Sequence, residues 1–338
     1  MIPPNATWNQ NATTFADQTQ IGTGPVGLYI HTNNSIYTIN KNNGQILIWM
    51  NNSTDPSLIL YTQLSSSALP IFVTTNGQIY VGDSTSIKSN SYSNQTIEIA
   101  NLSSSPIYGL FVDINNTLYC SIYNEHQVVK KSLNSNSSTM TTVAGNGSNG
   151  SASNLLNYPY GIFVDTNFDL YVVDTANNRI QLFRLGETNG TTVAGSTSAN
   201  PTISLSAPRY AILDGNKYLF ITDLNNRIIG SDENGFRCIV ACSMSSGATS
   251  DKLSAPQSLA FDSFGNLFVV DYSNNRIQKF SLLSNLSNSK IKKQRFDIFI
   301  SLFRNNNNND FNIHNLNLYI DIINNNNDFY IFNNNNKR

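Results

Sequence analysis

The chain contains several copies of one sequence repeat. The three clearest copies read PYGIFVDTNFDLYVVDTANNRIQLF, PRYAILDGNKYLFITDLNNRIIG and PQSLAFDSFGNLFVVDYSNNRIQKF. Three weaker copies precede them, so that six copies begin at or near a proline: Pro25, Pro70, Pro106, Pro159, Pro208 and Pro256. Repeats of roughly 40–50 residues made of short β-type runs are typical of radial or stacked β arrays.

Each copy divides into four short runs. In the copy at Pro159, the apolar run 161–164 is followed by a polar turn and by a second β-rich run, 170–173. An Asn-Asn turn leads to a third run, 179–183, and a fourth, TTVAG, occupies 191–195. Apolar runs of this length between turn residues indicate strands. Four antiparallel strands per repeat predict a propeller blade.

The two ends of the repeat region are complementary. The last copy stops near residue 283 without a fourth run, whereas the first copy is preceded by an unassigned TTFA at 13–16 that resembles TTVA at 191–194. An N-terminal strand that completes the last blade would remove exposed sheet edges. We therefore predict an all-β, six-bladed β-propeller of four-stranded antiparallel blades, closed by an N-terminal strand.

The repeats resemble a known family. The patterns P-x-G-I-x-V-D, L-Y-V-x-D and N-N-R-I-Q-x-F are similar to those of the NHL-repeat family of six-bladed propellers. The resemblance covers about 12–283 and is most specific in the last three copies. It implies recognition, because known NHL propellers mostly bind proteins and some bind RNA, while a few related propellers are enzymes.

The sequence changes character after the repeats. We expect residues 1–284 to form the propeller and 285–338 to form a disordered Asn-rich tail, because Asn runs occupy 305–309, 324–327 and 333–336. A short amphipathic helix near 297–304 is also predicted. Translated non-coding sequence would have a similar composition, and either interpretation predicts no functional site in the tail.

Charge argues against nucleic-acid binding. The net charge is −4 over 1–284 and +3 over 285–338, and Lys130-Lys131 is the only basic pair in the repeat region. Phosphate backbones are bound by clustered Lys and Arg, so nucleic acid is an unlikely partner. No apolar run approaches the ~18 residues of a membrane span.

Asn-x-Ser/Thr sequons indicate an extracellular protein or the ectodomain of a larger one, although the chain begins without the features of a signal peptide. An Asn-, Ser- and Thr-rich composition alone would also produce sequons. Many of them fall in predicted turns. The candidate glycosylation sites are Asn5, Asn11, Asn33, Asn51, Asn52, Asn94, Asn101, Asn115, Asn136, Asn146, Asn149 and Asn189.

Two sets of repeated charges are candidate sites. The first is a recurring Asp and Arg: Asp174 with Arg179, Asp223 with Arg227, and Asp271 with Arg276. These could form a ring of binding groups. The first copy has Asn40 and Gln45 at the same positions and the third has Ile122 and Gln127, whereas in the second Asp83 persists with no aligned Arg. Charges that disappear together favour a structural ion pair within each blade.

The second set closes the first run of four copies: Asp113, Asp165, Asp214 and Asp262. An Asp that begins a tight turn accepts backbone N–H groups, so we predict turn capping. Calcium binding by a ring of these acids would need convergent oxygens.

Cys238 and Cys242 align with Thr191 and Gly195 and so bracket a fourth run. An isolated C-x-x-x-C lacks the second pair of a zinc site. A disulfide is favoured, which requires a bend between the two residues; two free thiols are the alternative. Cys120 is expected to be an inert buried thiol.

The sequence contains no recognisable set of catalytic residues. Of the three histidines, His31, His126 and His314, the last lies in the tail, so the zinc ligands of amidating-lyase relatives are not supplied. We predict a non-catalytic recognition module without a cofactor, which binds a protein or glycan through a loop-bearing face, mainly through the irregular loops within 84–94, 134–157 and 187–207. The alternatives are a calcium-dependent propeller hydrolase or lyase, and an intracellular NHL module of an RNA-binding or ubiquitin-ligase protein.

Overall fold

A computed structural model describes residues 2, 6–50, 53–60, 70–84, 86–90, 96–102, 105–135, 139–196, 198, 202–283, 318–322 and 329–333. The chain divides into two units, Met1–Leu283 and Ser284–Arg338. The predicted helix near 297–304 lies outside the described residues.

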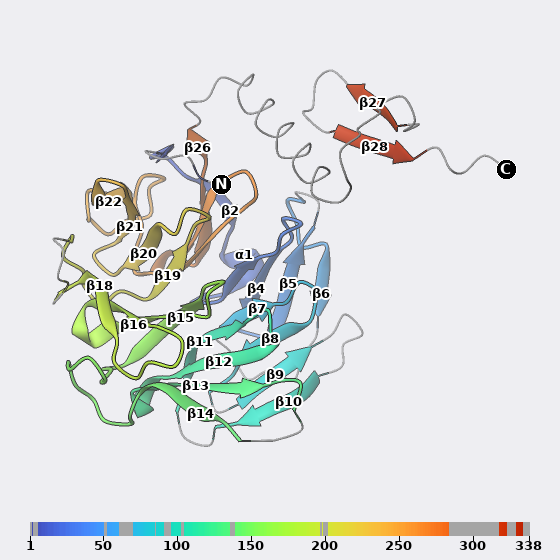
Figure 1. Ribbon diagram of the computed structural model, residues 1–338. Helices are drawn as coiled ribbons and strands as arrows, with labels where there is room; N and C mark the ends of the chain where they lie inside the picture. Colours follow the sequence, from blue (N-terminus) through green and yellow to red (C-terminus); the bar gives the residue numbers. More distant parts are fainter. Residues whose placement is uncertain are drawn as a thin grey trace, which may run out of the picture. The chain divides into compact units, whose positions relative to one another are not determined.

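The first unit is the predicted six-bladed propeller (Figure 1), with six four-stranded antiparallel sheets. Within each blade the first strand is innermost, and it contacts the first strand of the next blade, including β23 with β3 across the closing seam. The blades, from first strand to fourth, are β3 (Leu28–Ile30), β4 (Ile36–Asn40), β5 (Gln45–Trp49), β6 (Leu58–Leu60); β7 (Ile71–Val73), β8 (Ile79–Gly82), β9 (Ser86–Asn90), β10 (Thr96–Asn101); β11 (Ile107–Val112), β12 (Thr117–Ile122), β13 (Gln127–Ser132), β14 (Thr141–Gly145); β15 (Pro159–Val164), β16 (Leu170–Asp174), β17 (Arg179–Phe183), β18 (Thr191–Gly195); β19 (Tyr210–Leu213), β20 (Leu219–Asp223), β21 (Arg227–Asp232), β22 (Gly235–Val240); and β23 (Pro256–Phe261), β24 (Leu267–Asp271), β25 (Arg276–Phe280), β2 (Thr13–Ala16).

The N-terminal strand closes the ring as predicted. β2 pairs with β25 in the same register that β18 makes with β17, so that Thr14 faces Gln278 as Thr192 faces Gln181. The Thr14 hydroxyl donates to Gln278 Oε1 at 2.9 Å. A short strand before it, β1 (Thr7–Trp8), pairs with β26 (Leu282–Leu283).

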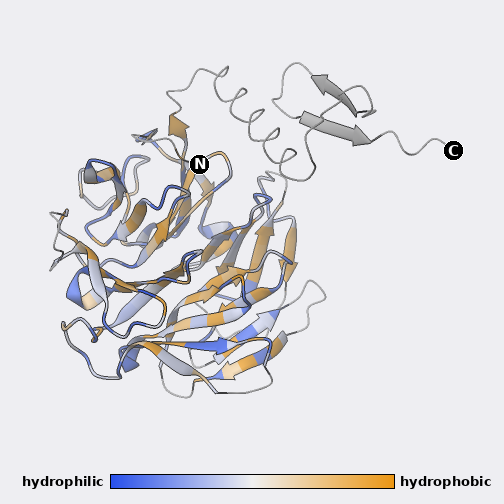
Figure 2. Ribbon diagram, in the orientation of Figure 1, coloured by the Kyte–Doolittle hydropathy of each residue, from blue (hydrophilic) through white to orange (hydrophobic). Residues whose placement is uncertain are grey.

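The core lies between neighbouring blades. Second strands and several third strands are buried on both faces because each sheet packs against a sheet on either side, which explains apolar runs such as that of β5 (Figure 2). Trp8 joins this core between the fifth and sixth blades: it is 2% exposed, contacts Phe220, and donates from Nε1 to the carbonyl of Gly265.

The ring has two different ends. We call one the aspartate-turn face; it is formed by the turns between first and second strands, at Asp113, Asp165, Asp214 and Asp262. We call the opposite end the proline face; there the first strands begin, at Pro25, Pro70, Pro106, Pro159, Pro208 and Pro256. The proline face also carries α1 (Gln18–Ile21), η1 (Tyr123–Glu125), η2 (Thr175–Asn177) and η3 (Tyr272–Asn274).

The second unit contains one described element, a hairpin of β27 (Leu318–Ile322) and β28 (Phe329–Asn333). This hairpin differs from the disorder expected of an Asn-rich tail. No helix among the described residues is long and apolar enough to cross a membrane.

Candidate functional site

The four turn aspartates accept backbone N–H groups of their own turns. Asp165 Oδ1, for example, accepts from Asn167 at 2.8 Å and from Asp169 at 3.0 Å. The other three make the same pair of bonds. We interpret these carboxylates as turn caps.

The recurring Asp and Arg form ion pairs inside the blades. The Nε–Oδ2 distances are 2.7 Å for Arg179–Asp174, 2.9 Å for Arg227–Asp223 and 2.7 Å for Arg276–Asp271. All three carboxylates are fully buried. Each also accepts the backbone N–H of the loop that enters its own blade, and Arg179 donates to three carbonyls of that loop. We propose that these pairs fasten each blade to its incoming loop and bind no ligand.

The second Asn of Asn-Asn-Arg has a role that the repeat pattern does not reveal. Asn178 has a left-handed conformation (φ 52°), and its Oδ1 accepts the N–H of Ala207 at 2.7 Å in the loop entering the next blade. Asn226 and Asn275 make the same link to Ala255 and Gly24. The acceptor therefore joins neighbouring blades, and Asn275 does so across the closing seam.

The weaker copies replace these contacts with others. The amide pair Asn40 and Gln45 keeps the register of the ion pairs. Asp83 pairs with Lys88 at 3.3 Å, so that a Lys takes the place of the Arg that is missing from the second copy. In the third blade His126 takes the place of the linking Asn, because its Nδ1 accepts the N–H of Tyr158 at 3.1 Å.

Cys238 and Cys242 form a disulfide, with the Cα atoms 5.7 Å apart. The predicted bend is present at Ala241, where φ is 57°. The predicted alignment is wrong by one residue: Cys238 lies within β22 and faces Ile229, which makes it equivalent to Thr192. Cys120 is a free, buried thiol, and burial raises the pKa of its thiol group far above the usual range.

The described glycosylation candidates are all exposed. They are Asn11, Asn33, Asn101, Asn115, Asn146, Asn149 and Asn189. The remaining candidates lie outside the described residues: Asn5, Asn51, Asn52, Asn94 and Asn136.

One of the three irregular ranges, 134–157, contacts both ends of the ring. The side-chain amide of Asn134 donates to the carbonyl of Asn115 at the aspartate-turn face, whereas the carbonyl of Gly150 accepts from Asn177 at the proline face. The range 134–157 therefore spans both ends of its blade.

The channel itself offers a more coherent site. Its wall at the aspartate-turn face carries an arc of aromatic rings at equivalent positions of four first strands, with centroid separations of 5.0 Å for Tyr29–Phe72, 4.8 Å for Phe72–Phe111 and 5.3 Å for Phe111–Phe163. The fifth and sixth blades have Ile212 and Ala260 at this position, as their pairing with the second strands shows.

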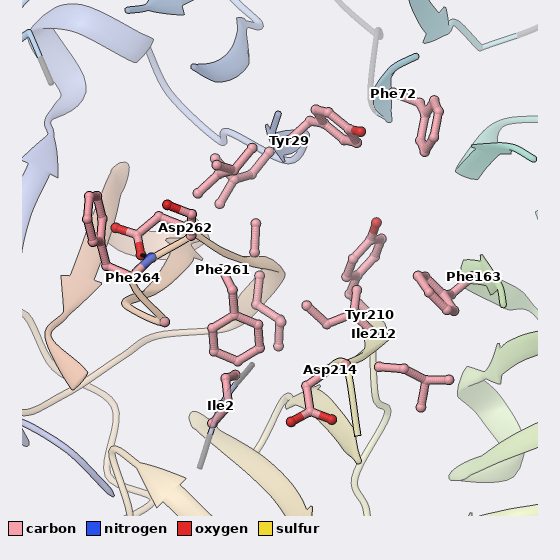
Figure 3. Close-up of a pocket in the computed structure, with 18 of the residues that line it drawn as sticks. Ile2, Tyr29, Phe72, Phe163, Tyr210, Ile212, Asp214, Phe261, Asp262 and Phe264 are labelled. Carbon is pink, nitrogen blue, oxygen red and sulfur yellow. Dashed lines mark hydrogen bonds between the residues drawn. The ribbon is translucent and has the colours of Figure 1, made fainter. Parts of the chain in front are cut away.

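The side chains of Ile212 and Ala260 are smaller than an aromatic ring and leave space in the channel. A cavity of about 370 Å³ opens at the aspartate-turn face, lined by residues of all six first strands (Figure 3). In Figure 3 the rings of Tyr29, Phe72 and Phe163 lie around it, and the carboxylates of Asp214 and Asp262 lie at its rim. The hollow thus combines an aromatic wall with hydrogen-bond acceptors at its edge.

Tyr210 divides the channel. It stands where other copies have Gly27, Gly109, Gly161 or Ser258, and a Cβ at Gly161 would lie 2.7 Å from its ring. It lines both the large cavity and a second one of about 20 Å³ toward the proline face. Burial raises the pKa of Tyr210 to about 12, so its phenol stays neutral at physiological pH.

A sequence signal for this site existed. The residue before V-D in the first run is Phe in GLFVD and GIFVD, and strand alternation places it on the opposite face from the inter-blade residues. Because the first run of each copy was expected to be buried on both faces, its alternation between channel-facing and inter-blade residues was not predicted.

Metal ligands do not converge in the described part of the chain: no group of three His, Cys, Asp or Glu there could hold an ion. His31 lies at the aspartate-turn face, where its Nε2 is buried without a hydrogen-bond partner among the described residues. His126 lies at the proline face, so the structure does not bring these two histidines together.

Comparison with known proteins supports the architecture. The NHL repeat model matches residues 253–280, which covers the loop and strands entering the sixth blade. No curated protein sequence matches the chain significantly.

Solved structures match over most of the propeller. An auxiliary nutrient binding protein from Bacteroides thetaiotaomicron superposes with a TM-score of 0.60 at 14% identity, over 77% of this chain and 69% of that chain. Virginiamycin B lyase from Staphylococcus aureus gives 0.57 at 13% identity, over 80% and 99%. A putative gluconolactonase gives 0.58 at 11% identity, over 83% and 94%.

At these identities the likeness establishes the fold alone. Together with the matched repeat, it identifies residues 1–283 as a six-bladed β-propeller that carries an NHL repeat.

Proposed function

We propose that the protein is a non-catalytic recognition module that holds a sugar ring of a glycan at the channel mouth of the aspartate-turn face. The observation that carries this proposal is the open cavity of about 370 Å³ with its aromatic wall. Sites of roughly 300–1,000 Å³ that combine apolar walls with a few polar groups are typical of small-ligand recognition.

The chemistry of the wall suits a sugar. The C–H face of a pyranose is apolar and fits the electron-rich faces of Phe111 and Phe163. Its hydroxyl groups donate to carboxylate oxygens, and the Oδ2 atoms of Asp214 and Asp262, which each accept one side-chain amide, from Asn216 and Asn266, have a second lone pair for a ligand. A protein partner that inserts an apolar side chain is the other recognition class.

The matched structures include both binding proteins and enzymes. The auxiliary nutrient binding protein agrees with ligand recognition. The lyase and the putative gluconolactonase favour a second candidate, a calcium-dependent hydrolase or lyase acting at the same mouth. Calcium-dependent thermal stabilisation would support that candidate.

An oxidising compartment is the proposed location. The Cys238–Cys242 disulfide supports it, and so does the exposure of the seven described glycosylation candidates. Mass spectrometry of the native protein that found every sequon unoccupied and both cysteines reduced would contradict this location.

The sharpest test fills the cavity without weakening the core. Ala260→Phe restores the aromatic ring that four other blades carry at this position, so the variant should fold. On a glycan array, wild type should bind a defined set of glycans, and the variant should lose at least tenfold in affinity for them.

Leu185→Ala is the matched control, because Leu185 is 63% exposed and lies outside the cavity. The control should bind like wild type. Equal binding by Ala260→Phe and wild type would exclude this mouth, and capture of peptides with no glycan binding would assign the cavity to a protein partner.

A further inference from the structure

The opposite mouth of the channel holds a positive charge that forms no ion pair with the acids the structure describes. Arg209 follows Pro208 at the proline face, and its guanidinium lies over the ring of Tyr160, with Cζ 4.7 Å from the centroid. Four other arginines, Arg179, Arg227, Arg237 and Arg276, each form an ion pair with an aspartate. Arg209 forms none with the described residues, and its Nε is buried without a hydrogen-bond acceptor there.

Neutral aromatic groups extend from Tyr160, the ring that contacts this cation. Tyr108 stacks on Tyr160 at 4.2 Å and contacts Tyr123 at 4.8 Å. The hydroxyl of Tyr160 donates to Oε1 of Gln257 at 2.7 Å. Burial, as the largest cause, raises the pKa of both Tyr108 and Tyr160, so these phenols stay neutral at physiological pH. Arg209 is the one charged side chain among the described residues that acts on the pKa of both.

Such an arrangement is costly without a ligand. A buried donor without an acceptor costs roughly 1–3 kcal/mol, and more when the donor is charged. The contact with Tyr160 offsets only part of this, since cation–π pairs contribute roughly 0.5–2 kcal/mol. An anion placed against the guanidinium would satisfy Nε and balance the charge.

We propose that the proline-face mouth binds a small carboxylate through Arg209. A carboxylate matches the two parallel N–H groups of the guanidinium fork. It also carries one negative charge, which equals the charge of Arg209, whereas a phosphate monoester carries roughly −1.5 to −2 at pH 7. The ring of Tyr160 beside the guanidinium favours an aromatic body on the ligand.

This site is separate from the proposed glycan site. Arg209 does not line the large cavity, and Tyr210 lies between that cavity and a smaller one toward the proline face. Occupancy of one site is therefore testable without the other.

Benzoate is the probe, and benzamide is its neutral counterpart of the same shape. Added to the full chain, benzoate should raise the melting temperature saturably and shift one arginine Nε–H resonance in ¹⁵N NMR. Arg209→Gln should weaken benzoate binding by roughly 10- to 100-fold, the loss expected when a charged hydrogen bond is removed. Arg209→Lys, which keeps the charge and loses the fork, should fall between.

Arg184→Gln is the matched control, because Arg184 is exposed and the change removes the same charge. It should bind benzoate like wild type, and so should Ala260→Phe, which separates this proposal from the glycan site. Equal binding of benzamide, tighter binding of inorganic phosphate, or unchanged benzoate affinity in both Arg209 variants would each overturn the assignment. If Arg209→Gln did not fold, Arg209→Lys and the Nε–H resonance would still decide the question.

Discussion

A single ion pair carries much of the connection between a blade and its incoming loop. Asp174 is fully buried and Arg179 is 3% exposed, and together they bind backbone groups from Ser151 to Asn157. Removing one member of a buried pair leaves the other charge without a partner, which typically costs roughly 3–5 kcal/mol. The same residues in an exposed pair would contribute far less.

Arg179→Met should therefore lower the free energy of unfolding by roughly 3–5 kcal/mol, as measured by urea denaturation. The double variant Asp174→Leu/Arg179→Met should lose less, because it leaves no isolated charge. Lys217→Ala is the control, since Lys217 is 54% exposed in its pair with Asp165, and it should cost below about 1 kcal/mol. A cost for Arg179→Met no larger than this control would show that the pair does not fasten the loop.

The link between the third and fourth blades depends on a titratable residue. His126 accepts the N–H of Tyr158 through Nδ1, where other blades use Asn. The pKa of His126 is lowered from 6.5, because burial disfavours the imidazolium and outweighs the attraction of Asp174. Protonation also removes the acceptor at Nδ1. A lowered folded pKa means that the unfolded chain binds the proton more readily.

The stabilising contribution of His126 should consequently be complete above pH 6.5 and decline as the pH falls below it. His126→Asn installs the residue used at the equivalent positions and removes the titration. Melting temperatures measured from pH 7.5 to 5.5 should fall more steeply for wild type than for this variant. Parallel curves would mean that the protonation state of His126 does not affect the link.

The elements themselves were largely predictable, and the reasons differ between them. Strand boundaries follow from apolar runs between turn residues, and β2 was recognisable because TTFA repeats the pattern of β18. The link by Asn178 was not predictable, since it joins segments 29 residues apart through a side chain that also suits an ordinary turn. The Cys238 alignment failed because the left-handed position after β22 is occupied by Ala241 instead of glycine.

The channel shows why a repeat predicts the fold better than the site. The repeated residues form the blades, their links and the aromatic wall of the channel, whereas the features that open each candidate site arise where the copies differ. Ala260 and Ile212 open the cavity, Tyr210 divides the channel, and Arg209 places an unbalanced charge at the other mouth. None of these residues stands out within its own copy of the repeat. Its contribution to a site can be recognised only when the six first strands are placed around one axis.

The whole ring depends on a segment at the opposite end of the sequence from the blade it completes. β2 supplies the fourth strand of the sixth blade, and Trp8 fills the core beside it. Deleting residues 1–17 should expose the edge of β25 and leave a cavity at the Trp8 position, so the variant should be aggregation-prone and melt far below wild type. Size-exclusion chromatography and calorimetry would measure both effects.

Single substitutions in the same N-terminal segment should lower the stability by smaller amounts than the deletion. Thr14→Ala removes one hydrogen bond to Gln278 and should cost about 1 kcal/mol. Trp8→Ala should cost roughly 3–5 kcal/mol, because it empties a fully packed site. A synthetic peptide of residues 7–17 should partly restore the melting temperature of the deletion variant, since strand pairing and the Trp8 contacts lie within it. A monomeric deletion variant with the wild-type melting temperature would show that the ring closes without this strand.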